Sequence, residues 1–236
     1  MSVHFLHEVE RLKKRILSLG AAVEENVRDA VEAIERRDAV LAAQVVAGDD
    51  DVDRAEVDIE EECLKLLALY QPVAVDLRYI VAILKINNDL ERISDLAVNI
   101  AQRAQYLGER APVPFPFDLR RMADHAQQML GQCLDALIEQ NEAAARAVCA
   151  ADAEVDAMNR AAYTRVLEAL RRDPANAEQI LCVFSVARQL ERIADHATNI
   201  AEDVLYMLRG EIVRHQAEAK GSFPAERVAA AHPGGG

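Results

Sequence analysis

Apolar residues recur at steps of three and four along most of the chain, which is the spacing of one face of an α-helix. The run Leu12, Ile16, Leu19, Val23 and Val27 is a clear example. Proline, which costs about 3 kcal/mol inside a helix, is confined to positions 72, 112, 114, 116, 174, 224 and 233. Helices are therefore predicted between these breaks, over residues 4–37, 38–70, 73–108, 118–140, 141–172 and 174–208.

Short polar residues support the same boundaries, because they are good N-caps. Three of them stand just before helical stretches: Asp38, Asp118 and Asn141. Asp173 is a further N-cap candidate, and Pro174 after it suits the first turn of a helix, as does Pro72. Inside the second helix a kink is expected at residues 48–51, where a glycine and three aspartates weaken the helix.

One twelve-residue stretch occurs twice. Residues 90–101, LERISDLAVNIA, and residues 190–201, LERIADHATNIA, are identical at nine of twelve positions. A match of this density at an offset of 100 residues indicates an internal duplication. We therefore predict an all-α protein made of two tandem, pseudo-symmetric three-helix bundles. The expected divisions are a first bundle at 1–108, a proline-rich linker at 109–117, a second bundle at 118–210 and a mostly disordered tail at 211–236.

Each copy of the repeat carries two carboxylates and an asparagine, spaced four residues apart. This spacing puts all three side chains on one face of a helix. The residues of this ridge are Glu91, Asp95 and Asn99 in the first copy and Glu191, Asp195 and Asn199 in the second. A mid-helix asparagine is mildly unfavourable, so its presence in both copies needs a reason.

A second repeated pattern, D-x-x-V-D, lies upstream of each ridge. Its outer aspartates are Asp49 and Asp53 in the first half and Asp152 and Asp156 in the second. Antiparallel neighbouring helices match levels when residues are counted outward from the turn that joins them. Counted from the turns at Pro72 and Pro174, four carboxylates reach one level of a helix pair in each half.

Carboxylates crowded in this way repel one another, and at about 5 Å with an effective dielectric constant of about 20 each pair costs roughly 3 kcal/mol. The candidate compensators are Arg92 and Arg192, raised carboxylate pKa values, or a bound di- or trivalent cation. Oxygen ligands suit magnesium, calcium, manganese or ferric iron, and can also hold zinc. Because the ridge points away from the main core of its bundle, a metal is expected in a surface groove. The alternative is a solvated helix face with Glu–Arg and Asp–Arg pairs.

Composition narrows the classes of function. The net charge of −13 argues against a nucleic-acid surface and suits cations or a basic partner. The N-terminus lacks an apolar signal region, and no apolar run reaches the roughly 20 residues that span a bilayer, so a cytoplasmic protein is expected. Its four cysteines, which show no C-x-x-C spacing, are expected to be buried free thiols. No P-loop or nucleophile elbow appears, so neither an enzyme nor an organic cofactor is indicated.

In its duplicated acidic motifs the sequence resembles the PhoU family of regulators of bacterial phosphate uptake. The resemblance covers residues 4–210 and rests on the duplicated L-E-R-I-[SA]-D…N-I-A motif, the paired acidic residues, QPVAVDLR at 71–78 and the two-times-three-helix layout. It implies two three-helix bundles whose acidic motifs hold multinuclear iron or zinc clusters on the bundle surfaces. By position, the implied ligands are Asp49, Asp53, Glu91 and Asp95 at one site and Asp152, Asp156, Glu191 and Asp195 at the other, flanked by Asn99 and Asn199.

The resemblance also implies a function, that of a non-enzymatic negative regulator of phosphate uptake and of the phosphate-starvation response. Such a protein is an adaptor between the ATPase subunit of the phosphate ABC transporter and its sensor histidine kinase. It is expected to be a homodimer, to reach the membrane only through its partners, and to bind iron, zinc, magnesium or manganese. Two departures of the second copy, Gln189 for Asp89 and His196 for Leu96, imply that the second site differs in affinity.

Two other interpretations stay open. One is a metal-free helical adaptor whose acidic residues meet a basic partner surface. The other is a ferritin-like metal storage or oxidase bundle, which requires inward-facing glutamates and E-x-x-H motifs. After Glu191 come Asp195 and His196, so the histidine is not three residues after the glutamate and the E-x-x-H motif is absent there. The linker segment 113–117 is expected to pack across the bundle junction.

Overall fold

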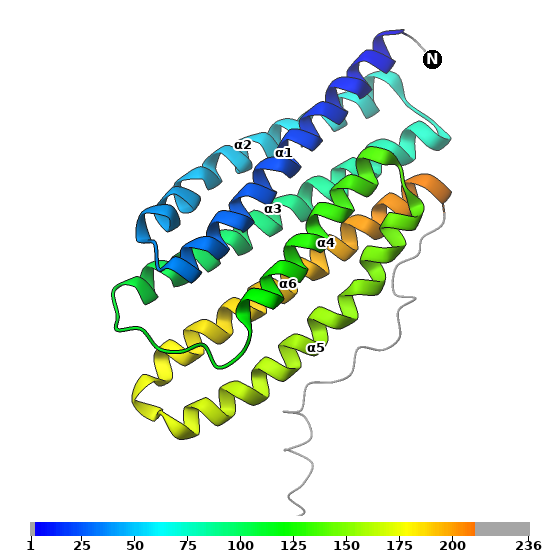
Figure 1. The fold of residues 1–236 in the computed structure, drawn as a ribbon. Helices are drawn as coiled ribbons and strands as arrows, with labels where there is room; N and C mark the ends of the chain where they lie inside the picture. Colours follow the sequence, from blue (N-terminus) through cyan, green and yellow to red (C-terminus); the bar gives the residue numbers. More distant parts are fainter. Residues whose placement is uncertain (1–2, 211–236) are drawn as a thin grey trace, which may run out of the picture.

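The computed structural model describes residues 3–210, which form six long α-helices (Figure 1). These are α1 (Val3–Arg36), α2 (Ala39–Tyr70), α3 (Ala74–Gly108), α4 (Leu119–Glu139), α5 (Glu142–Arg172) and α6 (Ala177–Arg209), with a 3-10 turn, η1 (Pro174–Asn176), before α6. The prediction of an all-α protein with six main helices is confirmed. The tail predicted at 211–236 lies outside the described residues.

Three of the predicted N-caps are confirmed by their hydrogen bonds. The Asp38 carboxylate accepts from the backbone N–H groups of the first turn of α2, Asp118 accepts from that of Arg121, and Asn141 accepts from that of Ala144. Each bond satisfies a helix N–H group that has no partner within its own helix. The helix boundaries at residues 38, 118 and 141 are therefore set by local sequence.

Two predicted helix starts are wrong by a few residues. The carboxylate of Asp173 accepts a 2.7 Å bond from the Asn176 side chain, and the chain forms η1 before α6 begins at Ala177. Pro72 lies before the first turn of α3, because Val73 is extended and Ala74 has a φ of 50°. The connection to α6 therefore contains an extra 3-10 turn, whereas α3 begins only one residue later than predicted.

α2 is one continuous helix through residues 48–51, where the sequence predicted a kink. Val45 and Val52, on either side of Gly48, are buried in the core. Tertiary packing of this apolar face therefore outweighs the weak helix propensity of the glycine and its aspartates.

α3 and α6 lie at the centre of the molecule, with α1 and α2 against α3 and α4 and α5 against α6 (Figure 1). They are antiparallel, since Lys85 contacts Asp203 at one end of the helix pair and Arg103 contacts Ser185 at the other. The two contacts are related by the 100-residue offset of the repeat. One hydrophobic core extends across both halves, and α1 also packs on α4.

The linker between α3 and α4 packs on the second bundle. Phe115 and Phe117 are half-buried against the core, and residues 113–116 lie over α5 and Ile180. Cysteines 63, 133 and 182 are buried free thiols as expected, and Cys149 is half-buried. Within residues 3–210, no helix has an apolar stretch long enough to cross a lipid bilayer.

Candidate functional site

Five carboxylates meet between α2 and α3 and are called here the first cluster. Its members are Asp49, Asp53 and Glu56 on α2 and Glu91 and Asp95 on α3. Ser94 fixes the register of the two helices by donating a 2.8 Å hydrogen bond from its Oγ to Oδ1 of Asp49. The prediction that four of these residues lie at one level of the helix pair therefore agrees with a direct contact between the helices.

The residues of the first cluster influence one another's protonation. Burial raises the pKa of Asp49, the hydrogen bond from Ser94 opposes this, and the charges of Asp53 and Asp95 raise it further. Burial also raises the pKa of Glu91, followed by the charge of Asp95, while Arg92 lowers it and Asp53 and Glu56 raise it. Interactions of this kind act over short distances, so the carboxylates of α2 and α3 share one electrostatic environment.

Glu56 is a member of the first cluster that sequence reasoning missed. Burial raises the pKa of Glu56, and the charges of Glu60 and Asp53 add to the effect. Its carboxylate accepts a 3.0 Å hydrogen bond from the buried Asn87 side chain of α3. The missed signal was its spacing, since Glu56 follows Asp53 by three residues and Asp49 by seven and so shares their helix face.

Arginine compensates the first cluster only in part. Arg92 lies 3.5 Å from the carboxylate of Glu91 and 3.7 Å from that of Asp95. Its side chain is 53% exposed, so water screens these pairs and each contributes little. The first cluster is therefore a group of partly buried and exposed carboxylates whose negative charge is only partly compensated.

The two asparagines of the ridge serve different contacts. Asn99 donates a 2.9 Å hydrogen bond to the backbone carbonyl of Asp95, one turn earlier in its own helix. Asn199 donates to Oδ1 of Asp89 across the α3–α6 interface at 3.4 Å. Neither of these hydrogen bonds is made to the acidic side chains predicted as metal ligands between α2 and α3 or between α5 and α6. A role of Asn99 and Asn199 as metal ligands therefore remains a prediction.

The corresponding residues of the second half, Asp152 and Asp156 on α5 with Glu191 and Asp195 on α6, are half-buried and called here the second cluster. Asp156 pairs with Arg160 on its own helix at 3.6 Å. The place of Glu56 is taken by Asn159, which is buried, and the place of Ser94 by Ala194. The second cluster thus has one carboxylate fewer and lacks the hydroxyl group that links the helices of the first.

Whether these residues suit a metal depends on charge and on geometry. The first cluster offers oxygen donors, among which Asp49 and Glu91 have pKa values raised by burial and by neighbouring carboxylates, and a hard cation would relieve that repulsion. Across residues 3–210, however, no three Asp, Glu, His or Cys side chains are arranged to hold an ion. The first cluster therefore fits a cation in its chemistry, and its side chains must rotate to converge on one.

The two departures between the repeat copies lie in contact with each other. His196 Nδ1 and Asp89 Oδ1 are 2.8 Å apart across the interface of α3 and α6. By the 100-residue offset, the matching positions on the other side of the pseudo-symmetry axis are Leu96 and Gln189. His196 and Asp89 are thus a polar pair that joins the two halves. From the sequence, the two departures from the repeat had been interpreted as a difference in metal affinity at the second site.

Comparisons with known proteins agree over nearly the whole described chain. A family model described as the PhoU domain matches residues 16–104 and 119–204. The phosphate-specific transport system accessory protein PhoU homolog of Pseudomonas putida is 37% identical over 99% of this chain and 94% of its own length. The homolog of the same description from Caulobacter vibrioides is 40% identical over 89% of this chain and 91% of its own.

Solved structures show the same arrangement of helices. The crystal structure of PhoU from Pseudomonas aeruginosa matches with a TM-score of 0.86 at 38% identity, covering 88% of this chain and all of that one (100%). The phosphate transport system regulatory protein PhoU from Streptococcus pneumoniae matches with a TM-score of 0.81 at 28% identity, covering 89% of this chain and 99% of its own.

Proposed function

This chain belongs to the PhoU family, and we propose that it is a non-enzymatic accessory protein of phosphate transport that represses phosphate uptake when phosphate is plentiful. The observation that carries the proposal is the match of both halves to relatives described as phosphate transport accessory or regulatory proteins, over nearly their full length. In this proposal the protein is a cytoplasmic adaptor between the ATPase subunit of a phosphate ABC transporter and a sensor histidine kinase.

The shape and charge of the molecule support an adaptor. Two bundles joined through α3 and α6 present separate outer faces on α1–α2 and on α4–α5 (Figure 1). The faces differ in charge, since α2 carries nine acidic and two basic residues and α5 carries five of each. Two unlike faces on one rigid body suit two different partners.

Deleting the gene in the host bacterium is expected to make alkaline phosphatase synthesis constitutive at high phosphate. The reason is that the kinase would lose the signal that reports a working transporter. Phosphatase activity measured in phosphate-rich medium checks this, with restoration by a plasmid-borne wild-type copy as the control. Normal repression in a deletion strain free of paralogues would contradict the regulatory role.

We also propose that the first cluster binds a hard cation, such as iron, zinc, magnesium or manganese, and that the second cluster binds one more weakly. The support is electrostatic: burial and mutual repulsion raise the pKa values of Asp49, Glu56 and Glu91. A bound cation would neutralise this charge and pull α2 and α3 together. Asp49, Asp53, Glu91 and Asp95 would supply the oxygen donors, with Glu56 beside them.

Replacing Glu91 by glutamine is expected to raise the melting temperature of the metal-free protein by about 2 °C at pH 7, which corresponds to about 0.5–1 kcal/mol for a chain of this size. A carboxylate whose pKa is raised in the folded state destabilises that state above the folded pKa, and the penalty disappears as the pH falls through it. The gain of Glu91→Gln should therefore shrink towards acidic pH. Thermal melts from pH 4 to 8 check this, with the exposed Glu61, which pairs with Lys65, changed to glutamine as the control.

The same variant tests the cation. Adding manganese, zinc or ferric iron should raise the melting temperature of the wild type and leave that of Glu91→Gln nearly unchanged. Elemental analysis of protein purified without a histidine tag should find metal in the wild type and less of it after Asp95→Asn. A wild type without metal and without a cation-dependent melting temperature would contradict the site and favour the metal-free adaptor.

A further inference from the structure

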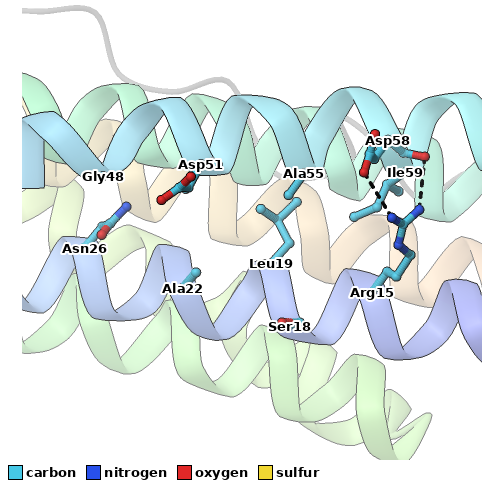
Figure 2. Close-up of a pocket in the computed structure, with 11 residues that line it drawn as sticks. Arg15, Ser18, Leu19, Ala22, Asn26, Gly48, Asp51, Ala55, Asp58 and Ile59 are labelled. Atoms are coloured by element: carbon cyan, nitrogen blue, oxygen red, sulfur yellow. Dashed lines mark hydrogen bonds and ion pairs between the residues drawn. The ribbon is translucent and has the colours of Figure 1, made fainter.

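A groove of about 390 Å³ lies between α1 and α2 (Figure 2). Its floor is apolar, formed by Leu19, Val52 and Ile59, and its walls are kept low by the small residues Ala22 and Ala55. The three floor residues are buried, so little of their surface is exposed in the groove. The groove exists because the small side chains of Ala22 and Ala55 leave the space above this floor unfilled.

The charged residues of the groove are distributed unevenly. At one end Arg15 is held by Asp58 at 3.0 Å and by the buried Glu62 at 2.7 Å, so its charge is satisfied within the protein. At the other end Asp51 forms an ion pair with Arg54 of its own helix and remains 79% exposed. The groove therefore presents an acidic lip to solvent.

The second half of the chain has a cavity of about 540 Å³ at the corresponding place, lined in part by Met122 and Met158, and its side chains differ from those of the α1–α2 groove. The N-caps Asp38 and Asn141 and the D-x-x-V-D patterns align α1–α2 with α4–α5 at an offset of 103 residues. At this offset His125 replaces Ala22 and Met158 replaces Ala55.

The larger side chains bridge the second helix pair. His125 Nδ1 lies 3.5 Å from a carboxylate oxygen of Glu154, the residue that corresponds to Asp51. A contact of this kind across the groove is impossible for Ala22. The helix pair of the second half is thus bridged at its His125 end and keeps a cavity at the end lined by Met122 and Met158.

The charge of the two helix pairs differs in the same sense. The helix that forms one wall of the open groove, α2, has a net charge of −7 from nine acidic and two basic residues, whereas α5 is neutral with five of each. More than half of the net charge of −13 thus lies on the helix beside the open groove. A partner that approaches this face meets a strongly negative potential.

From these observations we propose that the α1–α2 groove docks a basic amphipathic helix of a partner protein. A helix fits a groove walled by two helices, because its apolar side chains insert between theirs. Its apolar face would cover Leu19, Ala22 and Ala55, and its lysine or arginine residues would lie beside Asp51 and along α2. This inference rests on the proposed adaptor function, to which it adds the surface and the chemistry of one partner.

The test measures binding of the full-length protein to the purified transporter ATPase subunit and, separately, to the purified cytoplasmic part of the sensor kinase. Ala55→Met places a larger side chain in the groove, and Asp51→Lys reverses the charge of its lip. For the partner that docks here, each variant should raise the Kd roughly tenfold or more. Wild-type binding should weaken with added salt, and Asp51→Lys should reduce that dependence.

Matched changes on α5 are the controls. Glu154→Lys alters the position that corresponds to Asp51, and Ala153→Met enlarges a neighbouring exposed residue of α5; both should leave the Kd within about twofold of the wild type, as expected for residues outside an interface. Hydrogen–deuterium exchange of the wild type with its bound partner provides a readout that needs no variant. It should show protection within residues 15–26 and 48–59.

The outcomes separate the two proposals. If both partners bind Ala55→Met and Asp51→Lys as tightly as the wild type, or if the exchange footprint lies elsewhere, the groove is not the docking site and the adaptor function stands. If the wild type binds neither partner, the adaptor proposal fails and this inference fails with it. Circular dichroism melts of Ala55→Met establish that its loss of binding does not come from unfolding.

Discussion

Replacing Lys85 by methionine is expected to lower the free energy of unfolding by about 3 kcal/mol, the lower end of the cost of removing one partner from a buried ion pair. The carboxylate of Asp203 on α6 is only 2% exposed, and Nζ of Lys85 on α3 lies 3.2 Å from it. Methionine keeps much of the apolar stem of lysine but removes the positive charge. The Lys85 ammonium group also lies 4.9 Å from the ring of Tyr206, and that contact is lost as well.

The repeat supplies a matched control for this prediction. At the other end of the α3–α6 pair, Arg103 donates a 3.2 Å hydrogen bond to the hydroxyl group of Ser185, which occupies the position of Lys85 in the second copy. Ser185→Ala removes a bond that involves no buried carboxylate, so it should cost about 1 kcal/mol.

Urea denaturation followed by circular dichroism measures both variants. The double variant Lys85→Met with Asp203→Asn should recover part of the loss, because the buried group is then neutral. A loss below that of Ser185→Ala would show that water reaches Asp203 and that the pair does not hold the two halves together.

The helices of this protein could be predicted because their signals are local. Apolar positions at steps of three and four, the N-caps Asp38, Asp118 and Asn141, and the spacing of the prolines determine the six elements. The differences from these predictions have two causes, one tertiary and one local. Packing of Val45 and Val52 carries α2 through Gly48, and the hydrogen bond between Asp173 and Asn176 inserts a 3-10 turn before α6.

The acidic residues could be predicted as a group but not as a set of contacts. Helical spacing places Asp49 with Asp53 and Glu91 with Asp95, and counting from a turn brings the two pairs to one level. It does not reveal that the Ser94 hydroxyl group joins the helices, or that Glu56 belongs to the same face of α2 as a further carboxylate. Those facts depend on side-chain geometry between two helices.

Contacts between the two halves were beyond reach from the sequence for a further reason. Periodicity identifies the face that a helix buries, but not the helix that covers it. Asp89 and His196 lie 107 residues apart in the chain and appeared in the sequence as two separate departures from the repeat. In the structure they are one contact, so each explains the presence of the other.

The duplicated halves have thus diverged in a consistent way. The first half kept an open α1–α2 groove, a strongly acidic α2 and five carboxylates in its cluster. The second half has the larger side chains His125 and Met158 at the corresponding positions, a neutral α5, and Asn159 in place of one carboxylate. Divergence of this kind is expected when two copies of one unit are fused and each takes over a different contact.

The second large effect is expected from His196→Leu, which should lower the free energy of unfolding by about 2 kcal/mol. The substitution removes the main hydrogen-bond partner of the buried carboxylate of Asp89. Asp89 is 9% exposed, and its carboxylate then keeps only the longer 3.4 Å bond from Asn199. Adding Asp89→Gln should restore most of the loss, because the pair then becomes the Gln189 and Leu96 combination that the chain already uses on the other side of its pseudo-symmetry axis.

A matched change on that other side separates the polar contact from general packing at the interface. Oε1 of Gln189 is buried without a hydrogen-bond partner among the described residues, so Gln189→Leu should change the free energy of unfolding by less than about 0.5 kcal/mol or stabilise the protein. Urea denaturation of the three variants measures all of these values under one condition. Equal losses for His196→Leu and Gln189→Leu, or no recovery in the double variant, would mean that the interface depends on shape at these positions. Recovery in the double variant, with little change in Gln189→Leu, would show that His196 is needed because Asp89 is buried beside it.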